Sequence, residues 1–170
     1  MSLLKKIFFL SLILLSSGIL FFINYKSETY LIGWDNLFPE FNFKENITRT
    51  LFSSWQHYRG LGALDNFSHA ANLIHDLYRF FISLFFPISF VRWFFVFSLY
   101  FLGGLGQYLL LKKIIKNKFI SILSALFYLL NFYIIQQFFL PFEPFVIHFS
   151  ALPWLFLSLL NFLQKKEKKD

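Results

Sequence analysis

The sequence contains no cysteine and little charge. Only 15% of its 170 residues are Asp, Glu, Lys or Arg. The lack of cysteine excludes disulfide bonds and thiolate metal sites. The low charge excludes an ordinary soluble domain, in which about 25% of residues are charged.

Apolar and aromatic residues make up most of the chain instead. It is 57% hydrophobic and 24% aromatic, with 28 Phe residues and a mean hydropathy of +0.58. A soluble domain of this length cannot bury so many large apolar side chains, which indicates an integral membrane protein. The net charge of +7 would favour nucleic acid in a soluble protein. Here the Lys residues flank apolar runs, as topology determinants do, so no nucleic-acid partner is expected.

Four apolar runs approach or exceed the length of about 20 residues that crosses a bilayer as a helix. Backbone groups in lipid must form hydrogen bonds within their own segment, so these runs are expected to be helices. The predicted fold is all-α: a single membrane domain over 1–170 with four transmembrane helices and a long outer loop, 25–92, that carries interfacial helices. The predicted spans are 7–24, 93–111, 119–140 and 145–163.

Lysine clusters predict the orientation of these spans. They lie before the first run, between the second and third, and after the fourth. The positive-inside rule then places both termini in the cytoplasm and the loop 25–92 outside. The protein is expected to lie in the plasma (inner) membrane. The first run is interpreted as an uncleaved anchor, because no clear signal-peptidase site follows it. Gly103, Gly104 and Gly106 fall within the second span and predict close helix packing.

The outer loop predicts two amphipathic helices in the membrane interface, with lipids as partners. The first begins after Asn42, three residues before Glu45, which is the spacing of a helix cap. Its apolar residues recur at helical spacing and include Trp55, and a glycine pair at 60–62 is expected to end it. The second begins near residue 68, carries Asp76 and Arg79 on its polar side, and ends before Pro87.

Asp35 is the main candidate for catalysis. It follows the first span closely, next to Trp34, a residue type that anchors at membrane interfaces. A carboxylate at this height could act as a general base that deprotonates an acceptor hydroxyl. A phosphate-linked sugar needs no acid for its leaving group, so one carboxylate suffices, unlike the pair of a glycosidase. Alternatively, Asp35 caps a helix or remains solvated in the loop.

Arginines of the loop are candidates for binding a lipid phosphate. The planar guanidinium group binds phosphate oxygens in pairs, which suits Arg49, Arg59, Arg79 and Arg92. Attraction to anionic lipid headgroups explains them equally well. The histidines lack the spacing of a metal site, so neither a metal nor a cofactor is expected.

The loop also resembles a known family in its motifs. The matching stretches are Trp34-Asp35-Asn36, Pro39-Glu40-Phe41-Asn42, Trp55-Gln56-x-x-Arg59-Gly60-Leu61-Gly62 and His69-Ala70-Ala71-Asn72-Leu73. Together they are similar to the first outer loop of the alpha-(1->3)-arabinofuranosyltransferase family, large bacterial membrane proteins of the GT-C fold that use polyprenyl-phosphate sugars. The match covers about a quarter of the chain.

This resemblance implies a function and a site. It implies transfer of a sugar from a polyprenyl-phosphate donor to a cell-envelope glycan on the outer face. By position Asp35 matches the catalytic Asp or Glu of the family, with Glu40 as second choice. Trp34 and His69 join the arginines as substrate-binding candidates. Family members have many more spans, so the chain is expected to be an N-terminal portion of a larger domain. The alternative is a non-catalytic membrane scaffold or subunit that binds lipid or partner proteins.

Overall fold

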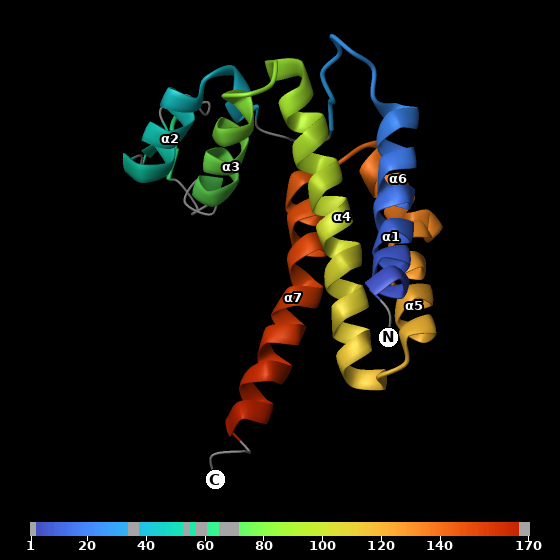
Figure 1. The fold of residues 1–170 in the computed structure, drawn as a ribbon. Helices are drawn as coiled ribbons and strands as arrows, with labels where there is room; N and C mark the ends of the chain where they lie inside the picture. Colours follow the sequence, from blue (N-terminus) through green and yellow to red (C-terminus); the bar gives the residue numbers. More distant parts are fainter. Residues whose placement is uncertain (1–2, 34–37, 53–54, 57–60, 65–71, 167–170) are drawn as a thin grey trace. The chain divides into compact units, whose positions relative to one another are not determined.

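The computed structural model describes residues 3–33, 38–52, 55–56, 61–64 and 72–166. Apart from one short antiparallel strand pairing, its regular elements are helices (Figure 1). Two described helices are long and apolar enough to cross a membrane, and a bent helix pair raises this number to three. The prediction of an all-helical fold is therefore confirmed, and two to three of the described helices could cross a membrane. The four spans expected from the sequence stay a prediction.

The chain divides into two compact units. The first comprises Met1–Lys26, Ile32–Asn36 and Val96–Asp170, and the second comprises Ser27–Leu31 and Leu37–Phe95. Helix α4 (Ile88–Ile115) begins in the second unit and continues into the first. The other helices of the first unit are α1 (Leu3–Asn24), α5 (Lys118–Leu130), α6 (Phe132–Phe139) and α7 (Glu143–Lys166).

Within the first unit, α4 is the helix on which α5 and α7 pack. The hydroxyl of Tyr100 donates a hydrogen bond to the carbonyl of Leu129 in α5 at 2.5 Å. The indole of Trp154 in α7 donates to the carbonyl of Leu102 at 3.0 Å. Such side chain-to-backbone bonds satisfy polar groups that lipid would leave without partners. They join the three helices by more than apolar contact.

The glycines of α4 allow this close packing. A Cβ atom added to Gly103 would lie 2.5 Å from the ring of Phe149, and one added to Gly106 would lie 2.6 Å from the indole of Trp154. Both neighbours belong to α7. The predicted role of these glycines in helix packing is confirmed, because a side chain at either position would separate the two helices.

Helices α5 and α6 meet at Asn131 with a bend of 47°. The Asn131 side chain serves both helix ends: Oδ1 accepts from the backbone N–H of Ile134 at 3.1 Å, and Nδ2 donates to the carbonyl of Phe127 at 3.1 Å. A break in an apolar helix exposes backbone groups that need such partners. The run predicted as one span, 119–140, is therefore two helices joined at a bend.

The second unit contains the 3-10 turn η1 (Pro39–Phe41), α2 (Phe43–Phe52), the strands β1 (Trp55–Gln56) and β2 (Ala63–Leu64), α3 (Leu73–Ser83) and the start of α4. Helix α3 packs against both η1 and α2. The rings of Phe43 and Phe80 meet edge to face at 5.5 Å between centroids and form part of the α2–α3 contact.

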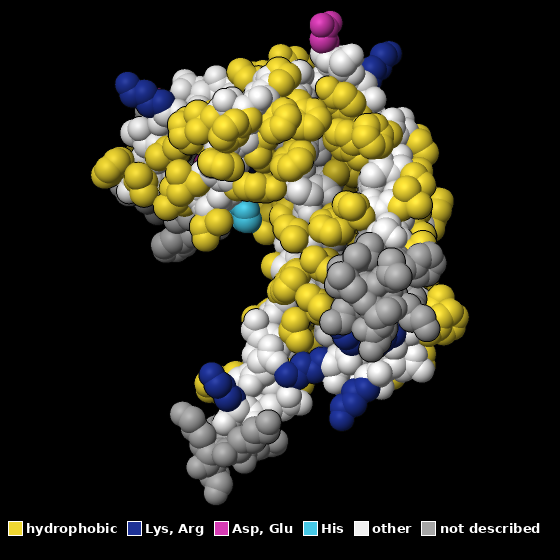
Figure 2. Space-filling view, viewed as in Figure 1, with side chains coloured by type: hydrophobic (Ala, Val, Ile, Leu, Met, Phe, Trp, Pro, Cys, Tyr) yellow, Lys and Arg dark blue, Asp and Glu magenta, His cyan; other side chains and the backbone are white. Residues whose placement is uncertain are grey.

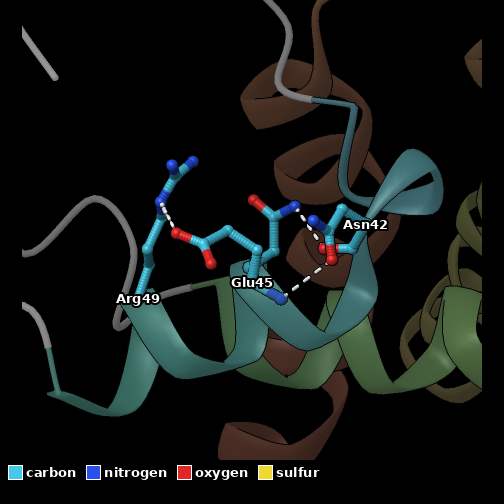
Figure 3. Close-up of polar contacts among 4 residues, drawn as sticks. Asn42, Glu45 and Arg49 are labelled. Carbon is cyan, nitrogen blue, oxygen red and sulfur yellow. Dashed lines mark hydrogen bonds and ion pairs between the residues drawn. The ribbon is translucent and has the colours of Figure 1, made fainter.

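Helix α2 begins as the sequence predicts. Asn42 Oδ1 accepts a hydrogen bond from the backbone N–H of Glu45 at 3.1 Å, and the Glu45 carboxylate pairs with Arg49 at 2.9 Å (Figure 3). An N-terminal cap followed by an i,i+4 pair stabilises a short helix locally.

The end of α2 differs from the prediction, which extended the helix through Trp55. The helix stops at Phe52, and Trp55 lies in β1, where it pairs with Leu64. Gly62, just before β2, has a φ of +99°. A Cβ atom added to Gly62 would lie 2.5 Å from the Trp55 ring. A glycine in the left-handed region lets the chain turn back, so the strand pairing replaces further helix.

Candidate functional site

Glu40 and Arg92 form a buried ion pair in the second unit. Arg92 Nε donates to Glu40 Oε1 at 2.7 Å, and the two residues are 2% and 3% exposed, respectively. The Arg92 guanidinium also lies 4.0 Å above the centre of the Phe38 ring. An arginine held by both a carboxylate and an aromatic face has a fixed position, because each contact restricts the planar group differently.

The two partners reach this pair from different local structures. Glu40 lies in η1, which starts at the fully buried Pro39. Arg92 is the fifth residue of α4, so it lies about 6 Å along the helix from Ile88. At 28 residues, α4 is about 42 Å long, close to the full thickness of a bilayer with its headgroups. The pair therefore lies near the level where headgroups meet hydrocarbon, if α4 spans the membrane.

One oxygen of the Glu40 carboxylate can still accept a hydrogen bond. Glu40 Oε2 is buried and accepts no hydrogen bond from the residues that the structure describes. Buried carboxylate oxygens normally have partners, so Oε2 can still accept a proton donor. Since Oε1 is bonded to Arg92, Glu40 is positioned by the fold rather than open to solvent.

A second buried charged group lies on α3. Arg79 is 1% exposed and Asp76 4% exposed. The Arg79 guanidinium stacks 4.0 Å above the Phe95 ring of α4, and the His75 ring meets Phe95 at 6.1 Å between centroids. Two arginines therefore lie at the start of α4, each stacked on a phenylalanine ring: Arg92 of α4 on Phe38, and Arg79 of α3 on Phe95.

Apart from the buried Arg79, the site residues proposed from the sequence fall into three groups. Glu40 and Arg92 are brought together. Arg49 pairs with Glu45 instead, on the partly exposed side of α2. Four residues lie outside the described part of the chain: Trp34, Asp35, Arg59 and His69.

Sequence reasoning did not anticipate the burial of Asp76 and Arg79. It assigned them to the polar side of an interfacial helix, and helical spacing correctly places both on one side of α3. That side packs into the protein, as their burial shows. The signal available was an acid and a base three residues apart within an apolar stretch, a pattern that local hydropathy cannot distinguish from a solvated face.

The described residues form no group of three or more His, Asp or Glu side chains that could hold a metal ion. Within the first unit, a cavity of about 30 Å³ lies between α1, α4 and α6, lined by residues that include Asn24, Phe97 and Phe138. Such a volume accommodates a water molecule or two. It is too small for a sugar or a lipid headgroup.

No family model, no curated protein and no solved structure matches this chain. Its classification therefore rests on its own residues: an all-helical protein with two to three helices that could cross a membrane.

Proposed function

We propose that this chain belongs to a membrane glycosyltransferase that transfers a sugar from a polyprenyl-phosphate carrier to a cell-envelope glycan on the outer face of the membrane. The resemblance of residues 34–73 to the arabinofuranosyltransferase loop supports this proposal. In it, the chain forms the N-terminal portion of a larger GT-C-like domain, both of its termini are cytoplasmic, and the segment 25–92 faces outward.

The observation that carries the proposal is the buried Glu40–Arg92 pair. Taking two charges out of water costs several kcal/mol per ion, which only good pairing geometry offsets. The fold therefore holds these two groups in position at a cost in desolvation free energy. Here that position is the start of a candidate span, where a lipid-linked phosphate would lie. Asp35 precedes Glu40 by five residues in the same segment.

The proposed reaction uses Asp35 as its base. The acceptor hydroxyl oxygen forms a bond to the anomeric carbon while the bond from that carbon to the phosphate oxygen breaks. The hydroxyl proton goes to the Asp35 carboxylate, and the polyprenyl phosphate leaves with the bonding electron pair. In this proposal Glu40 serves as a positioning residue that holds Arg92. The role assigned to Arg92 is to stabilise the negative charge of the leaving phosphate.

Release of polyprenyl phosphate tests this proposal, because it is the common product whichever sugar is carried. Membranes containing the whole protein are incubated with polyprenyl-phosphate sugars and a cell-envelope acceptor fraction, and the lipid product is measured. Asp35→Asn is expected to lower turnover by a factor of about 10² or more, the usual contribution of a general base. Glu45→Gln, on the exposed side of α2, is the control and should retain activity. Full activity of Asp35→Asn would contradict the proposal.

A second function is favoured by the burial of Arg92. Its side chain is almost fully enclosed and already bonded to Glu40, as in a purely structural ion pair. In a non-catalytic scaffold or subunit, the loop would bind lipid or protein partners without turnover. Binding of polyprenyl phosphate without release of sugar, unchanged by Asp35→Asn, would support this alternative over the enzyme.

A further inference from the structure

Helix α3 exposes its apolar side chains. Ile74 is 75% exposed, Phe81 59% and Leu84 60%. The turn that follows continues this surface with Phe85 at 67% and leads to Ile88, the first residue of α4, at 44%. Hydrophobic side chains cover much of the molecular surface around α3 (Figure 2). A contiguous surface of large apolar groups indicates contact with something other than water.

The charged side chains of the same helix point the other way. Asp76 and Arg79 are only 4% and 1% exposed, and in soluble proteins Asp and Arg are rarely fully buried unless they are paired. A helix on the surface of a soluble protein buries its apolar side and exposes its charges. The arrangement in α3 is the reverse. It lowers the free energy only if the medium outside the helix is apolar, because water would solvate the charges and not the phenylalanines.

The position of α3 along α4 identifies this medium. Arg79 stacks on Phe95, which is seven residues, or about 10 Å, beyond the start of α4. A span of about 42 Å extends roughly 6 Å beyond a hydrocarbon layer of about 30 Å at each end, so Phe95 falls within the acyl-chain region. The exposed residues Ile88 and Phe94 continue the apolar surface along the candidate span itself.

We propose that the outer side of α3 is embedded in the acyl chains of the bilayer, with Asp76 and Arg79 enclosed on its protein side. This assignment concerns how the second unit is held in the membrane, and it does not depend on sugar transfer. Helix α2 differs, since Lys44, Glu45 and Thr48 are exposed on it. In this arrangement α2 keeps a water-facing side, whereas α3 faces lipid.

Nitroxide accessibility tests the proposal directly. The chain has no native cysteine, so single-cysteine variants can be labelled without background. Ile74→Cys and Phe81→Cys report the outer side of α3, and Lys44→Cys is the water-facing reference. Each full-length variant is spin-labelled and reconstituted in phosphatidylethanolamine–phosphatidylglycerol vesicles. Its collision rates with oxygen, which concentrates in lipid, and with a water-soluble nickel chelate are then measured. Thermal unfolding compared with the parent protein verifies the fold of each variant.

The ratio of the oxygen rate to the nickel rate is expected to be several-fold higher at residues 74 and 81 than at residue 44. Ratios equal to that of Lys44→Cys would mean that α3 faces water and would overturn the proposal. Low rates with both reagents would mean that protein, another segment or another molecule, covers α3, and this result would overturn it as well. Two sites are used so that the result does not depend on a single variant folding.

Discussion

Arg92 Nε lies 2.7 Å from Oε1 of Glu40, a residue 52 positions earlier in the chain. This contact joins η1 to the beginning of α4 within the second unit. Both side chains are at least 97% buried, so the pair is shielded from solvent and from salt. Its measurable consequences differ from those of the exposed pair in the same unit.

Glu40→Gln is expected to destabilise the protein strongly. Removing one partner leaves the Arg92 charge buried without its carboxylate, which costs about 3–5 kcal/mol. The free energy of unfolding is measured in detergent micelles by chemical denaturation. Glu45→Gln breaks the Glu45–Arg49 pair, whose side chains are 49% and 29% exposed, and is expected to cost at most about 0.5 kcal/mol.

A double variant completes this comparison. Replacing both Glu40 and Arg92 with Leu removes the two charges together and is expected to recover part of the stability lost in Glu40→Gln. If Glu40→Gln destabilises no more than Glu45→Gln, the pair is not buried as described.

Gly106→Ala is expected to loosen the packing of α4 on α7. The new methyl group would lie 2.6 Å from the Trp154 indole, which must move and lose its hydrogen bond to the carbonyl of Leu102. A fall in the thermal midpoint of unfolding is expected. Gly18→Ala in α1 is the matched control, because nothing lies within 4 Å of its added Cβ and alanine favours helix, so its midpoint should stay equal or rise.

Asn131→Ala is expected to destabilise the bend between α5 and α6. It removes the acceptor for Ile134 N–H and the donor to Phe127, at a cost of about 1–2 kcal/mol for the cap. Asn117→Ala removes the cap of α5 at an exposed turn, where water can replace the side chain, and should cost less. Unfolding in micelles compares the two variants. Equal losses would show that the break at Asn131 is as well hydrated as the turn at Asn117.

Cysteine labelling tests the proposed orientation. Ser27 and Lys165 are both exposed, and the first belongs to the segment assigned to the outside. With a membrane-impermeant maleimide, Ser27→Cys is expected to react in intact cells, and Lys165→Cys only after permeabilisation. The opposite pattern would reverse the orientation inferred from the lysine clusters.

Features that depend on short stretches of chain were predictable from the sequence. The apolar runs predicted helices because a backbone in lipid satisfies its hydrogen bonds within the same segment. The cap at Asn42 was predictable because it spans three residues. The glycines of α4 predicted close packing, although their partners Phe149 and Trp154 were not evident.

Features set by hydrogen bonds that apolar periodicity does not record were not predictable. Helical spacing included Trp55 in α2, but its pairing with Leu64 across the Gly62 turn determined its strand conformation. The run 119–140 has the hydropathy of one span, yet the hydrogen bonds of Asn131 stabilise a bend there. In the first case backbone pairing across the turn selected the strand. In the second, the Asn131 side chain bonds the ends of both neighbouring helices, which hydropathy does not record.

The sequence by itself determined the preference of this chain for an apolar environment. Its apolar content and low charge favour lipid, since the free energy of transfer is roughly a sum over residues and requires no knowledge of contacts. The tertiary structure alone decided which charges meet and which side of a helix faces outward. Burial of Asp76 and Arg79 and the pairing of Glu40 with Arg92 depend on elements packed from far along the chain. Local periodicity identifies two sides of a helix, but only packing selects the side that is enclosed.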